Sequence, residues 1–260
     1  MTNWSAFFTA CQSIIDAGIG ITKPISLGES WTAAHTFEQI MASQGIDFYE
    51  DWVNGKVTSA TAPKLLYALG NLSTYLSFCN TDSASLTWDA ATAKLIASTA
   101  VFNVMGDWAN GEFLAAEQTF GVEYNVTMVP GTGDMYGLCI DTFQTPNNAP
   151  HPTNSRRWLE VVGSQAGQDA FNPLKGSISA RTDANLSKYG MYQRNASTDF
   201  KSVTYMFPSV VHGSGAPEAF KVGLQTIISQ FVSDKNIANA AAAIIALTAE
   251  CTWTKVWNLV

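Results

Sequence analysis

Residues 98–111 read Ser-Thr-Ala-Val-Phe-Asn-Val-Met-Gly-Asp-Trp-Ala-Asn-Gly. The first eight residues are rich in β-branched and apolar types, which favour a strand, and a helix is expected to begin at Gly106-Asp107-Trp108. A strand leading into a helix is the repeating unit of α/β folds, which present ligands at such switches because helix N-termini offer unpaired N–H groups. The stretch therefore predicts an α/β fold and places Asp107 and Trp108 at a candidate ligand site.

Helical and extended patterns alternate on both sides of this stretch. Apolar residues at helical spacing predict helices over residues 3–16, 31–43, 61–78, 89–96, 154–162, 165–171, 216–233 and 236–253. Asn3 and Ser30 are expected to cap the first two, and Pro63 suits a first helical turn. Strands are predicted over residues 21–27, 98–105, 122–129 and 135–140. Residues 144–153 are expected to form a loop, and residues 176–215 loops and short helices.

Composition and charge narrow the classes of partner. The 260 residues suffice for one large α/β domain or two small ones. No segment approaches the roughly 18 consecutive apolar residues of a membrane span, so none is predicted. The net charge of −7 repels phosphate backbones, which argues against nucleic acid as a partner. Eight Trp residues offer flat platforms on which sugar rings can stack.

Motifs for catalysis or metal binding are not found. The cysteines at 11, 79, 139 and 251 lack metal-ligand spacing and are interpreted as mostly buried thiols, although a long-range disulfide stays open if the protein is exported. His35, His151 and His212 form no HExxH pattern, and neither a GxSxG elbow nor a GxxxxGK[ST] phosphate loop occurs. We therefore expect no cofactor and no metal. Asp107 and Asp141 as a glycosidase pair remain a weaker alternative.

Six short motifs in order resemble one protein family. They are Trp88-Asp89, Val104-Met-Gly-Asp-Trp-Ala109, Val129-Pro-Gly-Thr132, Ile140-Asp-Thr-Phe143, Gln168-Asp-Ala-Phe-Asn172, and Lys175-Gly-Ser-Ile178 with Arg181. From Trp4 to about Phe231 the chain resembles the glucose and oligosaccharide solute-binding proteins of bacterial ABC importers, known as extracellular solute-binding protein family 1. The resemblance implies a non-catalytic protein that binds a mono- or oligosaccharide and delivers it to an ABC permease.

The same resemblance implies a type II periplasmic-binding fold, in which two α/β lobes close on a sugar. Family members open with an N-terminal lobe before the segment that resembles residues 2–8, so that lobe is expected to be absent from this chain. Residues 1–260 are then expected to form one lobe, with a core over 1–205 and returning helices over 206–260. The family works in the periplasm or outside the cell, whereas the first residues do not read as a signal peptide.

Seven residues are carried over from the resemblance as candidates for sugar binding. Trp108 would be the main stacking platform and Trp88 a second aromatic wall, Asp141 would accept hydrogen bonds from hydroxyls, and Lys175 and His212 would donate them. Asp107 and Trp31 are weaker candidates. Five of the seven have a structural alternative: Trp88 and Trp31 as packing residues, Asp107 as a helix cap, Lys175 as a solvated lysine and His212 as a structural histidine. Arg181 is assigned to structural pairing.

Three functions stay open at this point: a sugar-binding lobe, a glycosidase-like hydrolase, and an oligomerising interaction module with little sugar affinity. A site with one wall leaves aromatic side chains exposed, and such patches tend to be covered by a partner. We therefore expect a homo-oligomer or a partner that supplies the missing lobe. With half of the hydrogen bonds lost, monosaccharide affinity would fall to the millimolar range or weaker.

Overall fold

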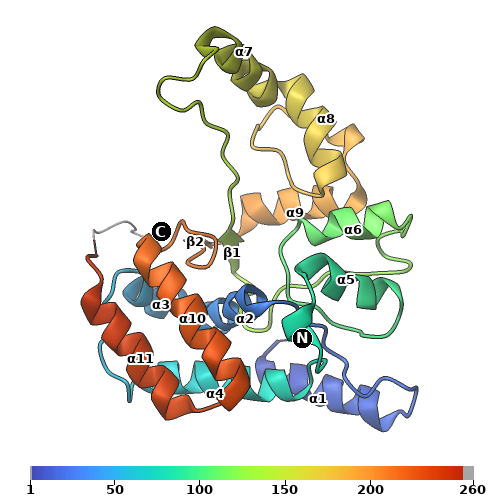
Figure 1. Cartoon of the computed structure of the whole chain (residues 1–260). Helices are drawn as coiled ribbons and strands as arrows, with labels where there is room; N and C mark the ends of the chain where they lie inside the picture. The colour runs from blue at the N-terminus through green and yellow to red at the C-terminus, as the bar shows by residue number, and fades with distance from the viewer. Residues whose placement is uncertain (1, 254–260) are drawn as a thin grey trace. The chain divides into compact units, whose positions relative to one another are not determined.

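The structure, a computed structural model, describes residues 2–253. A single pair of parallel strands is found there, β1 (Met135–Leu138) and β2 (Tyr205–Pro208), with Met135 opposite Tyr205 and Leu138 opposite Pro208. The helices are α1 (Trp4–Asp16), α2 (Ser30–Ala42), α3 (Ile46–Val53), α4 (Pro63–Ser77), α5 (Trp88–Ile96), α6 (Ala109–Ala115), α7 (Pro152–Gly163), α8 (Gln165–Lys175), α9 (Met191–Ser202), α10 (Glu218–Asp234) and α11 (Ile237–Glu250), with short 3₁₀ turns η1 (Ser83–Ser85) and η2 (Leu186–Lys188). The described chain is thus mixed α/β with few paired strands (Figure 1).

The chain forms two compact units. Unit 1 comprises residues 1–105, 127–139 and 203–260, and unit 2 comprises residues 106–126 and 140–202. From Val203 onward the chain belongs to unit 1.

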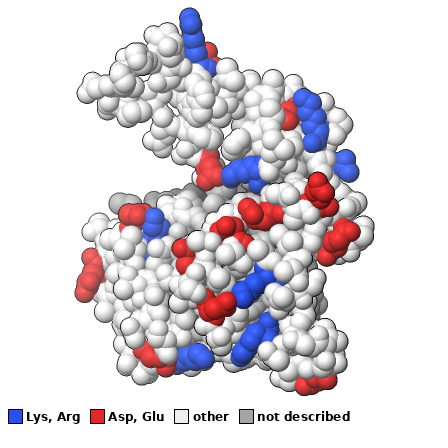
Figure 2. Space-filling view, turned by 45° about the vertical axis from the view of Figure 1, so that its right-hand side comes forward, with Lys and Arg blue, Asp and Glu red and all other residues white. Residues whose placement is uncertain are grey.

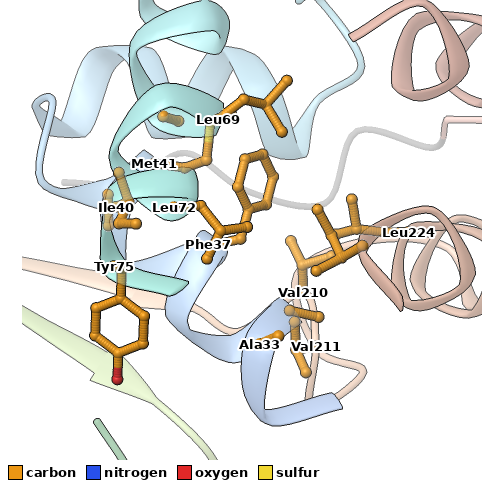
Figure 3. Packing of buried hydrophobic residues seen from close by; sticks show 14 of the residues in the cluster. Ala33, Phe37, Ile40, Met41, Leu69, Leu72, Tyr75, Val210, Val211 and Leu224 are labelled. Atoms are coloured by element: carbon orange, nitrogen blue, oxygen red, sulfur yellow. The ribbon is translucent and has the colours of Figure 1, made fainter. Parts of the chain in front are cut away.

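Helix α2 lies at the centre of unit 1. Most of its side chains are buried because both α4 and α10 pack against it, and α11 packs against α10 and α4 (Figure 1). Figure 3 shows side chains of α2 and α4 meeting Val210, Val211 and Leu224 in this core. The predicted returning helices α10 and α11 therefore share one core with α2 and α4.

Most of the predicted strands are wrong. Residues 98–105 and 21–27 are joined by an isolated bridge between Ile25 and Phe102 and by backbone hydrogen bonds of 2.8 to 2.9 Å, but they form no strand, and residues 122–129 lie in no strand either. Ile25 also bridges Cys79, so these segments run through the core of unit 1 without forming a ladder. Strand propensity reflects how well a side chain fits a half-buried surface, and here that surface is made of helices. Strand β1 confirms the prediction for 135–140, whereas β2 was not predicted.

Helix starts follow the local chemistry only in part. The Asn3 carboxamide accepts a hydrogen bond from the Ala6 N–H at 2.9 Å, which confirms it as the cap of α1. Pro63 occupies the first turn of α4, as predicted. Ser30 lies inside α2, whose N-cap is Glu29 without a side-chain bond, so that predicted cap is wrong. Helix α3 was not predicted.

Unit 2 contains α6, α7, α8 and α9, and its buried positions are largely polar. The Tyr189 hydroxyl donates to Asp169 Oδ1 at 3.1 Å, and the Gln193 amide donates to the carbonyls of Asn172 and Ser177 at 2.7 and 2.9 Å. Asp169, Asn172 and Gln193 are all buried. Hydrogen bonds among polar side chains thus organise this unit more than apolar packing does, because buried polar groups are stable only when paired.

Candidate functional site

The seven predicted ligand-binding residues divide between the two units. Asp107, Trp108, Asp141 and Lys175 lie in unit 2, and Trp31, Trp88 and His212 lie in unit 1. Within unit 2 the structure brings three of these residues into one polar cluster around Lys175. Within unit 1 it brings Trp31 and His212 together.

The polar cluster of unit 2 centres on the Lys175 ammonium. The ammonium pairs with Asp141 Oδ2 and lies 3.4 Å from the Ser177 hydroxyl, which in turn lies 3.4 Å from Asp107 Oδ1. The Asp141 side chain is 64% exposed and that of Lys175 30% exposed. These four residues form a polar row, Asp141, Lys175, Ser177 and Asp107, in which hydrogen-bond acceptors alternate with donors. The row begins at the exposed carboxylate of Asp141 and ends at the half-buried carboxylate of Asp107.

Burial raises the pKa of Asp107, whereas the positive charge of Lys175 and hydrogen bonds from Ile178 and Ser177 lower it. The carboxylate is not a helix cap, because α6 begins without a side-chain cap bond. The capping alternative for Asp107 is therefore wrong. Its side chain turns toward the segment that follows α8.

Gly176 explains why Lys175 and Asp107 meet. It ends α8 in the left-handed region at φ 96°, and a Cβ there would lie 2.8 Å from the Gly111 nitrogen and 2.9 Å from the Asp107 carbonyl oxygen. Only glycine permits so close an approach of the C-terminus of α8 to the first turn of α6. Lys175 is the last residue of α8, which corrects the predicted helix end at Phe171 and the loop position of Lys175.

Trp108 lies at the N-cap position of α6 and is half-buried. Its six-membered ring rests against Gly106, where a Cβ would lie 2.1 Å from the ring. The missing side chain of Gly106 therefore makes room for the indole. A side chain at position 106 would displace the ring.

In unit 1, three rings from α2 and the loop after β2 pack together. The Trp31 and His212 ring centroids lie 5.6 Å apart and the His35 and His212 centroids 5.2 Å apart, all edge to face. His212 Nε2 lies 3.3 Å from His35 Nδ1. His212 is in a loop, as predicted, and its contact with Trp31 places an indole beside an imidazole, a pairing suited to the apolar face and the hydroxyls of a polar ring.

Sequence reasoning missed Ser177 and His35 of these clusters, and also Glu38, whose buried carboxyl group accepts hydrogen bonds from Ser209 and Val211 in the loop after β2. Ser177 stands inside the motif Lys175-Gly-Ser-Ile178, yet a serine after glycine carries no distinctive signal. His35 and Glu38 follow Trp31 by four and seven residues, a spacing that places all three on one face of a helix. That spacing was the available signal, but it lies in a stretch that reads as an ordinary amphipathic helix.

Two other predicted residues have simple surroundings. Trp88 is the first residue of α5 and is half-buried. Arg181 pairs with Asp183 through Nε and Nη2 at 2.7 and 2.8 Å and donates to the Gly163 carbonyl, which confirms its structural pairing.

Several further properties bear on function. Residues 2–253 contain no group of His, Cys, Asp and Glu side chains arranged to hold a metal ion. No helix in that range combines the length and the apolar character that crossing a bilayer demands. Cys11 and Cys79 are buried free thiols, whereas Cys139 is exposed, against the expectation of burial. On the face in Figure 2, acidic and basic residues are interspersed over a mainly uncharged surface without a continuous basic patch.

The pKa shifts of Glu38 and His35 imply opposite pH dependences of the free energy of unfolding. Burial raises the pKa of Glu38 from 4.5 to about 7, so its contribution is present below pH 4.5 and is lost as the pH rises through 7. Burial, followed by the neighbouring His212, lowers the pKa of His35 from 6.5 to about 3, so its contribution is present above pH 6.5 and is lost as the pH falls through 3. Between pH 4.5 and 6.5 the two slopes oppose each other.

The variant His35→Gln should therefore expose the Glu38 slope. We expect its free energy of unfolding to fall by about 1.4 kcal/mol per pH unit from pH 4.5 toward 7, whereas the wild type stays nearly level up to pH 6.5. Urea unfolding followed by tryptophan fluorescence at pH 5 and pH 6.5 measures the difference. Equal pH slopes in the two proteins would contradict the assignment.

The chain is similar in sequence to binding proteins of ABC transporters. No protein-family model matches it. It is 39% identical over 242 residues to an uncharacterized ABC transporter extracellular-binding protein of Pyrococcus horikoshii, covering 92% of this chain and 54% of that protein. It is 31% identical over 225 residues to a "probable sugar-binding periplasmic protein" of Mesorhizobium japonicum, covering 80% and 52%. A xylose/arabinose-binding protein of Haloferax volcanii is 27% identical, covering 85% and 48%.

Solved structures show the same fold. The galactopyranose receptor AcbH superposes with a TM-score of 0.76 at 14% identity, covering 94% of this chain and 64% of that one. A chitin oligosaccharide binding protein superposes with a TM-score of 0.77 at 13% identity, covering 96% and 64%. The chain thus spans about half the length of the curated relatives it matches.

Proposed function

The chain belongs to the solute-binding proteins of ABC sugar importers, and from this premise we propose that it binds a mono- or oligosaccharide without catalysing a reaction. The observation that carries the proposal is the row Asp141, Lys175, Ser177 and Asp107 in unit 2, together with Trp108 at the start of α6. Its partner would be an ABC permease, and its place of work the periplasm or the cell exterior, as for the relatives.

The row suits sugar hydroxyls because each hydroxyl donates one hydrogen bond and accepts others. An exposed carboxylate beside an ammonium offers one strong acceptor and one strong donor at neighbouring positions, and bonds to charged groups are the stronger ones. The indole of Trp108 would cover the apolar face of the pyranose. No covalent step is required of any of these groups, which favours binding over glycoside hydrolysis.

Isothermal titration of the purified chain with glucose, xylose and short oligosaccharides tests the proposal. If the polar row and Trp108 bind sugar without a second lobe, we expect saturable binding in the millimolar range or weaker, since each missing hydrogen bond removes about 1 kcal/mol of binding free energy. Chromatography of the sugars after prolonged incubation should show them unchanged. Release of a shorter sugar would favour the hydrolase alternative, and no saturation with any sugar would reject binding by this chain alone.

A second function, an interaction module, is favoured by the surface of unit 2. Most of the large apolar side chains that are exposed lie there, although unit 2 is the smaller unit. Phe143, Trp158 and Phe171 form an exposed aromatic cluster, with ring centroids 5.2 Å apart for Phe143 and Trp158 and 6.2 Å apart for Phe143 and Phe171. We infer that this surface is covered by another polypeptide, in the first instance a second copy of the chain.

The variant Val161→Glu tests that surface. Val161 follows Trp158 by one turn of α7 and is 63% exposed, so a glutamate there should fold normally and oppose association. We expect the wild type to sediment as a dimer or larger species and Val161→Glu to shift by at least tenfold in dissociation constant. Val222→Glu, at a valine of unit 1 that is 51% exposed, is the matched control and should behave as the wild type. A wild type that stays monomeric at high concentration would reject the idea.

A further inference from the structure

One face of α2 carries three polar or aromatic side chains in sequence. Trp31, His35 and Glu38 are spaced by four and three residues, which places them on the same side of the helix. All three face the loop 209–215, which connects β2 to α10. Two of them contact the ring of His212, and the third contacts the backbone of the loop.

Glu38 is fully buried and holds the loop backbone. Its Oε2 accepts hydrogen bonds from the Val211 N–H at 2.7 Å and from the Ser209 hydroxyl at 3.1 Å. Its Oε1 is buried without a hydrogen-bond partner among the described residues. Burying a carboxylate with one oxygen unsatisfied is unfavourable, so stability alone does not explain this residue.

Ser209 passes the constraint on to His212. Its hydroxyl oxygen accepts from the His212 N–H at 3.0 Å while donating to Glu38, and its carbonyl accepts from the Ser214 and Gly215 N–H groups at 2.9 and 2.7 Å. A continuous set of hydrogen bonds thus joins the carboxylate of Glu38 to the backbone nitrogens on either side of His212. The loop is closed on itself at the point where Glu38 holds it.

The ring of His212 is fixed from the other side by α2 as well. The indole of Trp31 packs against it at 75° and the imidazole of His35 at 66°, with His35 Nδ1 3.3 Å from His212 Nε2. Backbone and ring are therefore both set by residues of the same helix face. A rigid helix that fixes both ends of a side chain positions it far better than a loop alone does.

We propose that Glu38, through Ser209, is a positioning residue that holds the loop 209–215 so that His212 is presented for sugar binding. The inference rests on the proposed function, because it takes His212 as a sugar contact. Glu38 itself is buried and touches no ligand. Its Oε2 accepts two hydrogen bonds while its Oε1 accepts none. An apolar side chain of the same size could accept neither of the two bonds.

Two substitutions at Glu38 separate positioning from packing. Glu38→Gln keeps an oxygen that can accept from Val211 and Ser209, whereas Glu38→Met keeps the volume and loses the acceptor. Amide hydrogen exchange of Val211 and His212 by NMR reports the loop without any sugar present. Thr248→Val, which removes a buried hydroxyl bonded to the Ile244 carbonyl in α11, is the control for a general loss of stability.

In Glu38→Met we expect exchange at Val211 and His212 to rise at least tenfold relative to amides of α4, and sugar affinity to fall about tenfold. Glu38→Gln should stay within about threefold of the wild type in both, and Thr248→Val should leave the ratio of loop to α4 exchange unchanged. If Glu38→Met keeps the loop as protected as the wild type, or only matches Thr248→Val, the inference is overturned.

Ser209→Ala gives an independent arm if Glu38→Met does not fold. It removes the link between Glu38 and the His212 N–H but keeps the Val211 bond, so exchange at His212 should rise more than at Val211. An equal rise in amide exchange at both residues would contradict the role of Ser209 in linking Glu38 to the His212 N–H. Failure of the proposed function is recognised separately: His212→Ala would leave sugar affinity unchanged while the exchange results at Glu38 still hold.

Discussion

Replacing Phe37 by alanine is expected to lower the free energy of unfolding of unit 1 by about 3 to 5 kcal/mol. Phe37 is fully buried in the middle of α2, and its ring meets Trp52 edge to face at 6.1 Å. Figure 3 shows it between side chains of α2, α4 and α10. Removing the ring costs both its transfer free energy and the contacts of a cavity that three packed helices cannot close.

Urea unfolding followed by tryptophan fluorescence measures this loss. Phe143→Ala is the matched control, because that ring is 44% exposed in unit 2 and its removal should change the free energy by less than about 1 kcal/mol. A loss below about 1 kcal/mol for Phe37→Ala as well would show that α2 is not the centre of the core.

Trp108→Ala is expected to weaken sugar binding at least tenfold. The indole is the only large aromatic surface in the turn that leads into α6, and it stands next to Asp107, the inner end of the polar row. Loss of a stacked ring removes both buried area and an oriented C–H contact, and a factor of ten corresponds to about 1.4 kcal/mol. Calorimetry with the sugar that binds the wild type most tightly gives the ratio of dissociation constants.

Two variants sharpen that measurement. Trp158→Ala removes another half-exposed indole of unit 2 that lies in the aromatic cluster, and it should leave the affinity within about twofold of the wild type. Gly106→Ala keeps the indole but forces it away, since the new Cβ would overlap the ring, and it should weaken binding as Trp108→Ala does. Unchanged affinity in Trp108→Ala would refute the role of the indole.

The helices of unit 1 show what periodicity alone predicts. The apolar spacing in α1, α2, α4, α10 and α11 marks faces that are indeed buried, and Asn3 and Pro63 mark two of the starts. Three of the predicted strands are wrong because runs such as 98–105 form at most an isolated bridge with a neighbouring segment and no continuous ladder. Tertiary packing decides whether a buried apolar segment pairs with a strand or packs against helices. The spacing of apolar residues within the segment does not predict this.

The candidate sites show a similar limit. Asp141 and Lys175 were predicted from motifs, but their pairing depends on the left-handed turn at Gly176 and on α8 continuing through Pro173 to Lys175. A proline normally ends a helix pattern in the sequence, which is why the end of α8 was placed too early. The sequence did not point to His35, Ser177 and Glu38 because each of them joins a cluster only through contacts with residues far away in the sequence.

Titration of the chain with glucose and then a short oligosaccharide, followed by the indole N–H signals of a ¹⁵N-labelled sample, tests sugar binding most directly. Each tryptophan gives its own signal, and Trp108→Ala assigns the one that matters. We predict that the Trp108 signal shifts progressively and saturates with added sugar, while that of Trp158 stays in place. A Trp108 signal that does not move up to about 100 mM sugar, well above the millimolar affinity expected, would contradict the account.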